Sequence, residues 1–284
     1  MPSTTLNVDL VESMHRAVAR GRPTDGVTQQ IDSVTLAGLL EYGCLRYAEP
    51  GLVPVLPDSI YESELGRALQ RVPSLLGVGL TCAPKALIRN LDIQSVEFQL
   101  LGPVEALDTD VQWQSFLARF ERSARAAGFT SLAASKLQSA FFEMSENALL
   151  HSGSPVTPLV GYAVADATAQ FCVVDVGIGV RASLLQNPRY ANLSDDVEAV
   201  QLALQTGTTC RRDELGGLGF QSVFKALAEQ WGELRFRSGN GCISMDGKGV
   251  SADQCRRHRP PRIPGFQVSV CCSAGAGGPL TRPF

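Results

Sequence analysis

One segment, residues 141–151, constrains the fold of this chain most strongly. Its sequence, Phe-Phe-Glu-Met-Ser-Glu-Asn-Ala-Leu-Leu-His, has neither Gly nor Pro and is apolar around most of a helix. Glu143, Asn147 and His151 interrupt that apolar surface at four-residue spacings, so they form one polar stripe. A carboxylate and an amide buried without partners would cost several kcal/mol. We therefore expect something polar to cover the stripe.

The hydrophobic period changes after this helix, which we expect to begin near Ser131 as N-cap and to end at Ser152-Gly153. Residues 159–164 and 170–174 are typical of two β-strands joined by a turn near Asp166. Residues 171–174 of the second strand are all apolar, which favours a central position in a sheet. It ends in the sequence Asp175-Val176-Gly177-Ile178-Gly179.

A long polar connection follows, at 181–214, with one predicted helix at about 195–204. The sequence Gly216-Gly217-Leu218-Gly219-Phe220 then opens another predicted helix, at 221–230. Backbone N–H groups of such a turn, at a helix N-terminus, can bind phosphate. No Lys-Ser or Lys-Thr pair follows, so the turn is not a Walker A loop.

Each element has a chemical use and a purely structural alternative. Asp175, at the mouth of a buried strand, could accept a hydrogen bond from an adenine amino group, while Gly177 and Gly179 let the backbone approach a flat base. Asn147 offers Mg²⁺ a neutral oxygen, and Glu143 could orient or deprotonate an attacking water or hydroxyl. The alternatives are a turn that merely ends a strand and a polar cluster bonded to backbone.

In this order the three elements resemble the GHKL superfamily (gyrase B subunits, the heat-shock ninety chaperones, histidine kinases and MutL), which shares the Bergerat ATP-binding fold. The pair Glu143-x-x-x-Asn147 resembles its N box, residues 175–179 its first glycine box, and residues 217–220 its second. The form Glu-x-x-x-Asn-x-x-x-His is most similar to the anti-sigma-factor serine kinases. The resemblance covers about residues 105–272 and implies a two-layer α/β sandwich.

The resemblance also implies roles for individual residues, with ATP and Mg²⁺ as cofactors. Glu143 would be catalytic, Asn147 would hold the metal ion, and Asp175 would read adenine. Residues 181–216 would form a lid over the nucleotide. The remaining residues implied to bind the cofactor are glycine-box positions: Gly177, Gly179, Gly217, Leu218 and Gly219. One departure is Leu215, which stands where histidine kinases usually have a further Gly.

Two functions follow from this resemblance. The first is a regulatory ATP-dependent protein kinase or phosphotransferase of the anti-sigma-factor or histidine-kinase-like class. The alternative is a nucleotide-gated protein-interaction module or slow ATPase without phosphotransfer. Glu143 favours chemistry, and the sequence shows no phosphoacceptor-histidine hairpin, so the phosphoacceptor or protein partner would be encoded elsewhere.

The rest of the chain predicts a small N-terminal α/β domain of unknown role at 1–102, before the ATP-binding domain at 103–272 and a flexible tail at 273–284. Gly102-Pro103 marks the boundary. In the first segment we expect helices at 5–20 and 62–70 among short apolar runs at 34–40, 52–56 and 96–101. Further predictions are a helix at 110–127 and strands at 233–237, 242–245 and 266–271.

The composition indicates a soluble globular protein, with 44% apolar and 19% charged residues. A net charge of −3 predicts no general attraction to nucleic acid or to anionic membranes. The N-terminus lacks the pattern of a secretory signal, and the eight scattered cysteines favour reduced thiols, so we expect a cytoplasmic protein. The pair Cys255-x-x-His258 has no second pair to complete a zinc site. Whether the chain forms a homodimer stays open.

Overall fold

The computed structural model describes residues 4–61, 93–101, 110–153, 158–204, 232–245 and 255–274. The predicted helices at 62–70 and 221–230 and the glycine turn at 216–220 lie outside these ranges. Within them, no helix is both long enough and apolar enough to cross a membrane. The helices are α1 (Val8–Val18), α2 (Asp25–Thr28), α3 (Leu36–Ala48), α4 (Asp58–Tyr61), α6 (Val111–Ala126), α7 (Ser131–His151), α8 (Gly179–Leu184), the 3-10 helix η2 (Pro188–Tyr190) and α9 (Asp196–Ala203).

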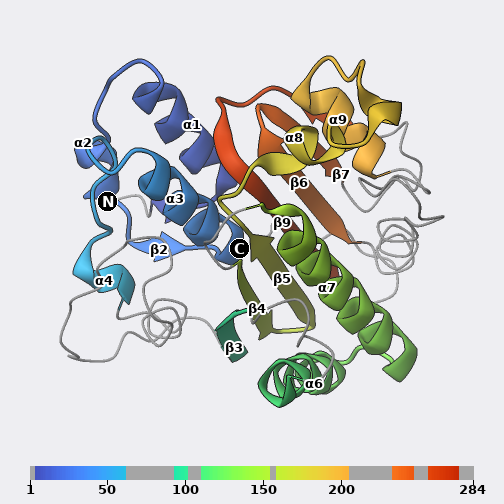
Figure 1. The fold of residues 1–284 in the computed structure, drawn as a ribbon. Coiled ribbons are helices and arrows are strands. Elements are labelled where there is room, and N and C mark those ends of the chain that lie inside the picture. Colours follow the sequence, from blue (N-terminus) through green and yellow to red (C-terminus); the bar gives the residue numbers. More distant parts are fainter. Residues whose placement is uncertain are drawn as a thin grey trace.

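One seven-stranded antiparallel sheet forms the centre of the molecule (Figure 1). Its order is β3 (Ile93–Leu100), β4 (Leu159–Ala165), β5 (Thr168–Val174), β9 (Ile263–Ser273), β6 (Glu233–Gly239), β7 (Gly241–Met245) and β8 (Arg256–His258). A second, parallel pair joins β1 (Thr5–Leu6) to β2 (Ser33–Val34). The fold is therefore mixed α/β: an antiparallel sheet packed against helices, with a small N-terminal α/β part.

The predicted hairpin of β4 and β5 is confirmed, and β5 has a neighbour on each side. The turn between the strands is Asp166-Ala167, and both residues have positive φ, of 40° and 41°. Two consecutive residues of positive φ match the right-handed twist of the flanking strands.

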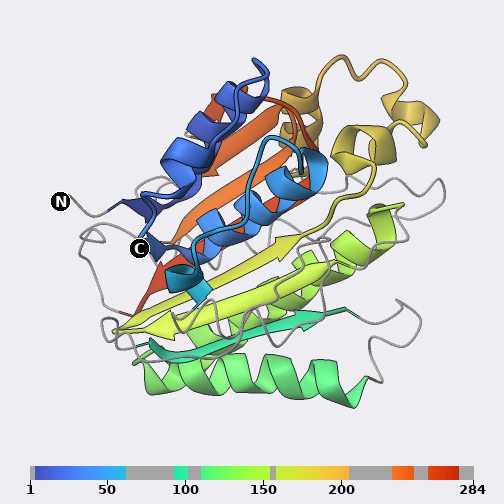
Figure 2. The ribbon, with the colours of Figure 1, turned by 90° about the vertical axis from the view of Figure 1, so that its left-hand side faces the viewer.

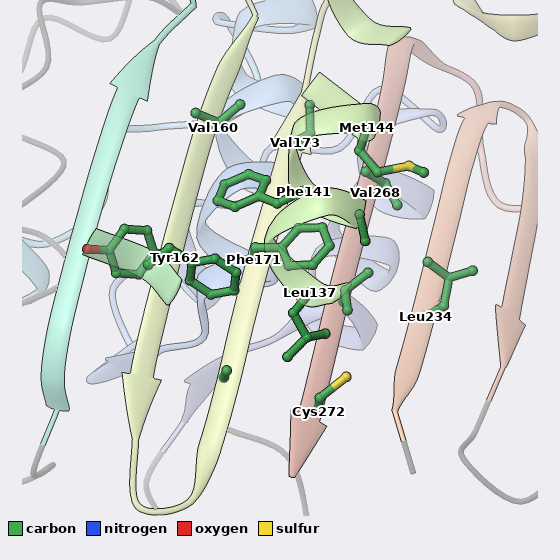
Figure 3. Packing of buried hydrophobic residues seen from close by; sticks show 14 of the residues in the cluster. Leu137, Phe141, Met144, Val160, Tyr162, Phe171, Val173, Leu234, Val268 and Cys272 are labelled. Carbon is green, nitrogen blue, oxygen red and sulfur yellow. The ribbon is translucent and has the colours of Figure 1, made fainter. Parts of the chain in front are cut away.

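Helices α6 and α7 cover one face of the sheet around an aromatic core (Figure 3). Phe141 of α7 stacks on Phe171 of β5 with ring centroids 4.6 Å apart, and Phe120 of α6 meets both rings edge-on. Both helices were predicted. The N-cap of α7 is Thr130, whose hydroxyl accepts from Ala133 N, so Ser131 is the first helical residue and not the cap.

Helices α1 and α3 lie across the opposite face of the sheet (Figure 2). The strand β5 is buried on both sides: Phe171 and Val173 contact the α6–α7 layer, whereas Cys172 and Val174 contact the α1–α3 layer. This double burial explains why residues 171–174 are all apolar. The described helices thus cover both faces of the sheet. The resemblance implied a two-layer sandwich, in which helices cover only one face.

The apolar run at 34–40 enters the helix α3, which begins after its N-cap Thr35. Gly38 lets this helix approach β1 closely, because a Cβ there would lie 2.3 Å from the carbonyl oxygen of Leu6. The predicted domain boundary at 102/103 follows β3 in the chain. Since β3 pairs with β4, strands from both sides of that position share the sheet.

Candidate functional site

Asp175 follows the last residue of β5 at one end of the sheet. Its backbone N–H donates to the Phe266 carbonyl at 3.0 Å. Its carboxylate accepts at Oδ1 from Gly177 N (2.6 Å) and at Oδ2 from Phe266 N (3.3 Å). The side chain is buried, with 3% of the residue exposed. Burial raises the pKa of Asp175 to about 6, although both backbone donors favour the ionised form.

The glycines of this turn are required by the surrounding backbone. A Cβ on Gly177 would lie 1.9 Å from the Ser152 carbonyl oxygen, and Gly179 has φ +79°. Gly265, which also has positive φ, donates its N–H to the Gly177 carbonyl at 2.9 Å. Packing alone therefore accounts for glycine at these positions, so the glycines are not independent evidence of a bound base.

The C-terminal end of α7 is bonded to the same turn. Ile178 N donates to the carbonyl of Ser152 at 2.7 Å, and Ser152 directly follows the last helical residue, His151. This contact places the helix that carries the polar stripe beside the strand end that carries Asp175.

The stripe residues Glu143, Asn147 and His151 are all half-buried. They project from one flank of α7, because the fully buried positions Met144 and Ala148 face the core. The predicted site thus has two of its three elements adjacent, α7 and the 175–179 turn. Its third element, with Gly217, Leu218 and Gly219, lies outside the described residues.

The described part of the predicted lid, 181–204, is folded rather than irregular. It contains α8, η2 and α9, with a small apolar core of Leu184, Leu193 and Ala199. The guanidinium of Arg181 donates to the Leu193 carbonyl at 3.2 and 3.3 Å. The predicted helix at 195–204 is confirmed as α9, and its N-cap is Asp195.

A hollow of about 580 Å³ opens beside Gly177, between the 175–179 turn, the end of α3 and the start of β9. Tyr47 and Ile178 supply apolar surface. Charges of both signs line the hollow: Arg181, Arg262, Glu49 and Asp196, with Arg262 and Asp196 3.8 Å apart. Sequence reasoning missed Tyr47 and Arg262 as neighbours of this turn, because nothing local links α3 or the segment before β9 to it.

A second feature missed from the sequence is a buried ion cluster between the α1–α3 layer and β6, which we call the β6 ion cluster. Its members are titratable residues from four elements: Glu12, His15, Glu41, Arg235, Arg237 and His258.

Glu41 is the anion at the centre of this cluster. It accepts from Arg235 Nε at 2.7 Å and from the fully buried Arg237 at 3.0 Å. Burial opposes ionisation of Glu41, but the two guanidinium charges outweigh it and lower the pKa of that carboxyl. Burial, aided by Arg237, lowers the pKa of His15 to about 4, so this imidazole is neutral at pH 7.

The sequence signal for this cluster was an alternation in residues 234–237, Leu-Arg-Phe-Arg, with Glu41 inside an otherwise apolar run. Charged residues at such positions indicate buried ion pairs. The sequence did not indicate the partners, because Glu41 and Arg235 are 194 positions apart.

Comparisons with protein-family models, with curated proteins and with solved structures find no match to this chain.

Proposed function

We propose that the protein binds ATP with Mg²⁺ in the manner of the GHKL superfamily, between α7 and the turn that follows β5. The observation that carries this proposal is Asp175: a buried carboxylate at the end of a central strand, beside the helix with the Glu143–Asn147 stripe. We also propose that the fold is the Bergerat fold, because the chain has its helix, strand pair and glycine turn in the same order.

The electrostatics of Asp175 support a ligand-binding role. Burial raises its pKa, so its ionised form destabilises the folded protein at neutral pH. Strongly perturbed carboxyls of this kind concentrate at functional sites. An adenine amino group donating to this carboxylate would stabilise the charged form, and a base without that donor would leave it poorly compensated.

The other roles follow from the resemblance. Asn147 would hold Mg²⁺ through its amide oxygen, and Gly177 and Gly179 would line the base pocket. Gly217 and Gly219, with Leu218 between them, would bind phosphate through backbone N–H groups.

Titration of the protein with ATP, with and without Mg²⁺, tests the site. Asn147→Ala should weaken binding about tenfold with Mg²⁺ present and have little effect when EDTA removes the metal, because only the metal contact is lost. Asn7→Ala is the matched control, since Asn7 instead caps α1 through Leu10 N, outside the proposed nucleotide site. Equal loss with and without Mg²⁺ would argue against the metal role of Asn147.

We further propose that the protein is a regulatory kinase or phosphotransferase, with Glu143 as the residue that orients or deprotonates the attacking group. Transfer of labelled γ-phosphate, to protein in a lysate or to water, should fall about 100-fold or more in Glu143→Gln while ATP affinity stays unchanged. Glu146→Gln, also half-buried on α7, is the control. Binding without transfer or phosphate release would favour a nucleotide-gated interaction module.

The partner in this proposal is a protein substrate or regulator encoded elsewhere, contacted with the help of the N-terminal α/β part. We place the protein in the cytoplasm. All six cysteines in the described ranges are free thiols, which fits a reducing compartment.

A further inference from the structure

Three potential metal ligands meet on the α1–α3 face of the sheet, away from the proposed nucleotide site. Cys242 of β7 and His258 of β8 are directly paired across the two strands, so their side chains lie on the same face. Glu12 of α1 contacts His258: its Oε1 lies 2.9 Å from His258 Nε2. One ligand atom from each of the three residues lies within 4.8 Å of the others.

The donor types match a particular class of metal. A thiolate, an imidazole and a carboxylate together suit Zn²⁺, whereas Mg²⁺ and Ca²⁺ prefer oxygen alone. In a tetrahedral zinc site the bond lengths of about 2.0–2.3 Å place ligand atoms roughly 3.3–3.8 Å apart. The Glu12 and His258 atoms, 2.9 Å apart, therefore need to separate slightly to admit an ion, and any pair near the 4.8 Å limit needs to close by about 1 Å; side-chain rotation can supply both movements.

We propose that Glu12, Cys242 and His258 form a zinc site. Three protein ligands leave a fourth position for water or an incoming ligand. The metal joins α1 to the β7–β8 edge, so it clamps the N-terminal part of the chain onto the sheet. Binding releases the thiol proton of Cys242 to solvent.

Burial of two of the three ligands fits this site. Cys242 is fully buried and Glu12 is 4% exposed, so a bound ion would be shielded from competing water. His258 Nδ1 is buried and has no hydrogen-bond partner among the described residues. Because Glu12 Oε1 lies beside Nε2, that nitrogen is the ligand atom in the proposed site, and Nδ1 is the second ring nitrogen, which points away from the metal.

Two cations in the described part of the chain contact the proposed ligands: Arg16 donates to Glu12 Oε2 at 3.0 Å, and Arg235 NH1 lies 3.5 Å from His258 Nε2. A metal on Glu12 Oε1 and His258 Nε2 must displace Arg235. Its NH2 group donates to Glu12 at 2.6 Å, but its Nε also donates to Glu41 at 2.7 Å. When zinc takes Glu12, Arg235 keeps an anionic partner in Glu41. The thiolate formed at Cys242 neutralises part of the metal charge.

The fold also separates this site from the Cys255-x-x-His258 sequence pattern. Cys255 packs against the α6–α7 core, on the other face of the sheet from Glu12. The sulfur ligand in this proposal is Cys242, which lies sixteen positions before His258 in the sequence and opposite it in the sheet.

Cobalt substitution tests the proposal on the full chain. Chelator-treated protein titrated with Co²⁺ should develop the sulfur-to-metal charge-transfer band and the visible bands of tetrahedral Co²⁺, and one equivalent of Zn²⁺ should remove them. Cys242→Ser should abolish the charge-transfer band, and His258→Gln should weaken Co²⁺ affinity about tenfold or more. Cys255→Ser is the matched control and should bind like wild type.

Circular dichroism of each variant establishes that it is folded, and the part-exposed His258 gives a variant that tolerates substitution if Cys242→Ser does not fold. Absence of a tetrahedral Co²⁺ spectrum in the wild type would overturn the proposal. So would a charge-transfer band that persists in Cys242→Ser, or wild-type affinity in His258→Gln. In either case the three residues act as a metal-free link between α1 and the sheet.

Discussion

Replacing Asp175 by Asn gives a prediction whose magnitude follows from the structure. Folding raises the pKa of this carboxyl from 3.8 to about 6, so the folded protein holds the proton more tightly than the unfolded chain. The ionised form therefore costs the folded protein free energy, and this cost grows as pH rises from 3.8 to about 6 and is constant above. It amounts to about 3 kcal/mol at pH 7.5 and about 1 kcal/mol at pH 4.5.

An Asn side chain does not ionise, so Asp175→Asn removes this cost. Its single oxygen can accept only one of the two backbone N–H groups, from Gly177 and Phe266, that the carboxylate accepts now. The lost hydrogen bond costs about 1–3 kcal/mol at every pH. We therefore expect the free energy of unfolding of the variant, relative to that of wild type, to be about 2 kcal/mol higher at pH 7.5 than at pH 4.5.

Urea unfolding of both proteins at the two pH values measures this change directly. Asp166→Asn, in the exposed turn at the other end of β5, is the control for replacing an aspartate by asparagine away from the site. A stability difference for Asp175→Asn that does not change with pH would refute the reasoning, because the carboxylate would then not be strained by burial.

Two further substitutions probe the contacts around the site and the β6 ion cluster. Gly177→Ala should lower the free energy of unfolding by about 1–3 kcal/mol, because its Cβ meets the Ser152 carbonyl oxygen; urea unfolding equal to wild type would show that the turn can shift freely. Glu41→Gln should destabilise by about 3–5 kcal/mol, because it removes the anion between buried Arg235 and Arg237; a thermal midpoint unchanged from wild type would contradict this ion pairing.

The sequence predicted those elements whose hydrophobic pattern matches the faces that are buried in the fold. The strand β5 could be placed centrally because its residues 171–174 are all apolar, as expected of a strand that is covered on both faces. The helices α6 and α7 have clear start signals and a helical period, and both appear at the expected places.

The helix α3 could not be recognised in this way. Its residues Leu36–Leu45 are buried on nearly every side, against both α1 and the sheet, so they show no polar face. A short, wholly apolar run is compatible with a buried strand or a buried helix, and periodicity does not separate the two. The predicted helix at 5–20 contains α1, but the sequence did not indicate that α1 and α3 cover the second face of the sheet.

The candidate site shows the same limit. Asp175 lies at the end of the strand, as predicted. Its burial depends on β9, which pairs with β5 and is distant in the sequence. The pairing of Glu41 with Arg235, and of Cys242 with His258, depends on strand register and on packing of distant segments. Residue spacing does not encode such contacts.

The most direct test of the ATP site is the base selectivity of nucleotide binding, measured by calorimetric titration of Mg²⁺·ATP and Mg²⁺·GTP. We predict one ATP per chain, with GTP at least about tenfold weaker, because the GTP base presents a carbonyl where adenine presents the amino group that Asp175 accepts. In Asp175→Asn this preference should disappear. Absence of ATP binding, or an unchanged preference for ATP in the variant, would contradict the proposed site.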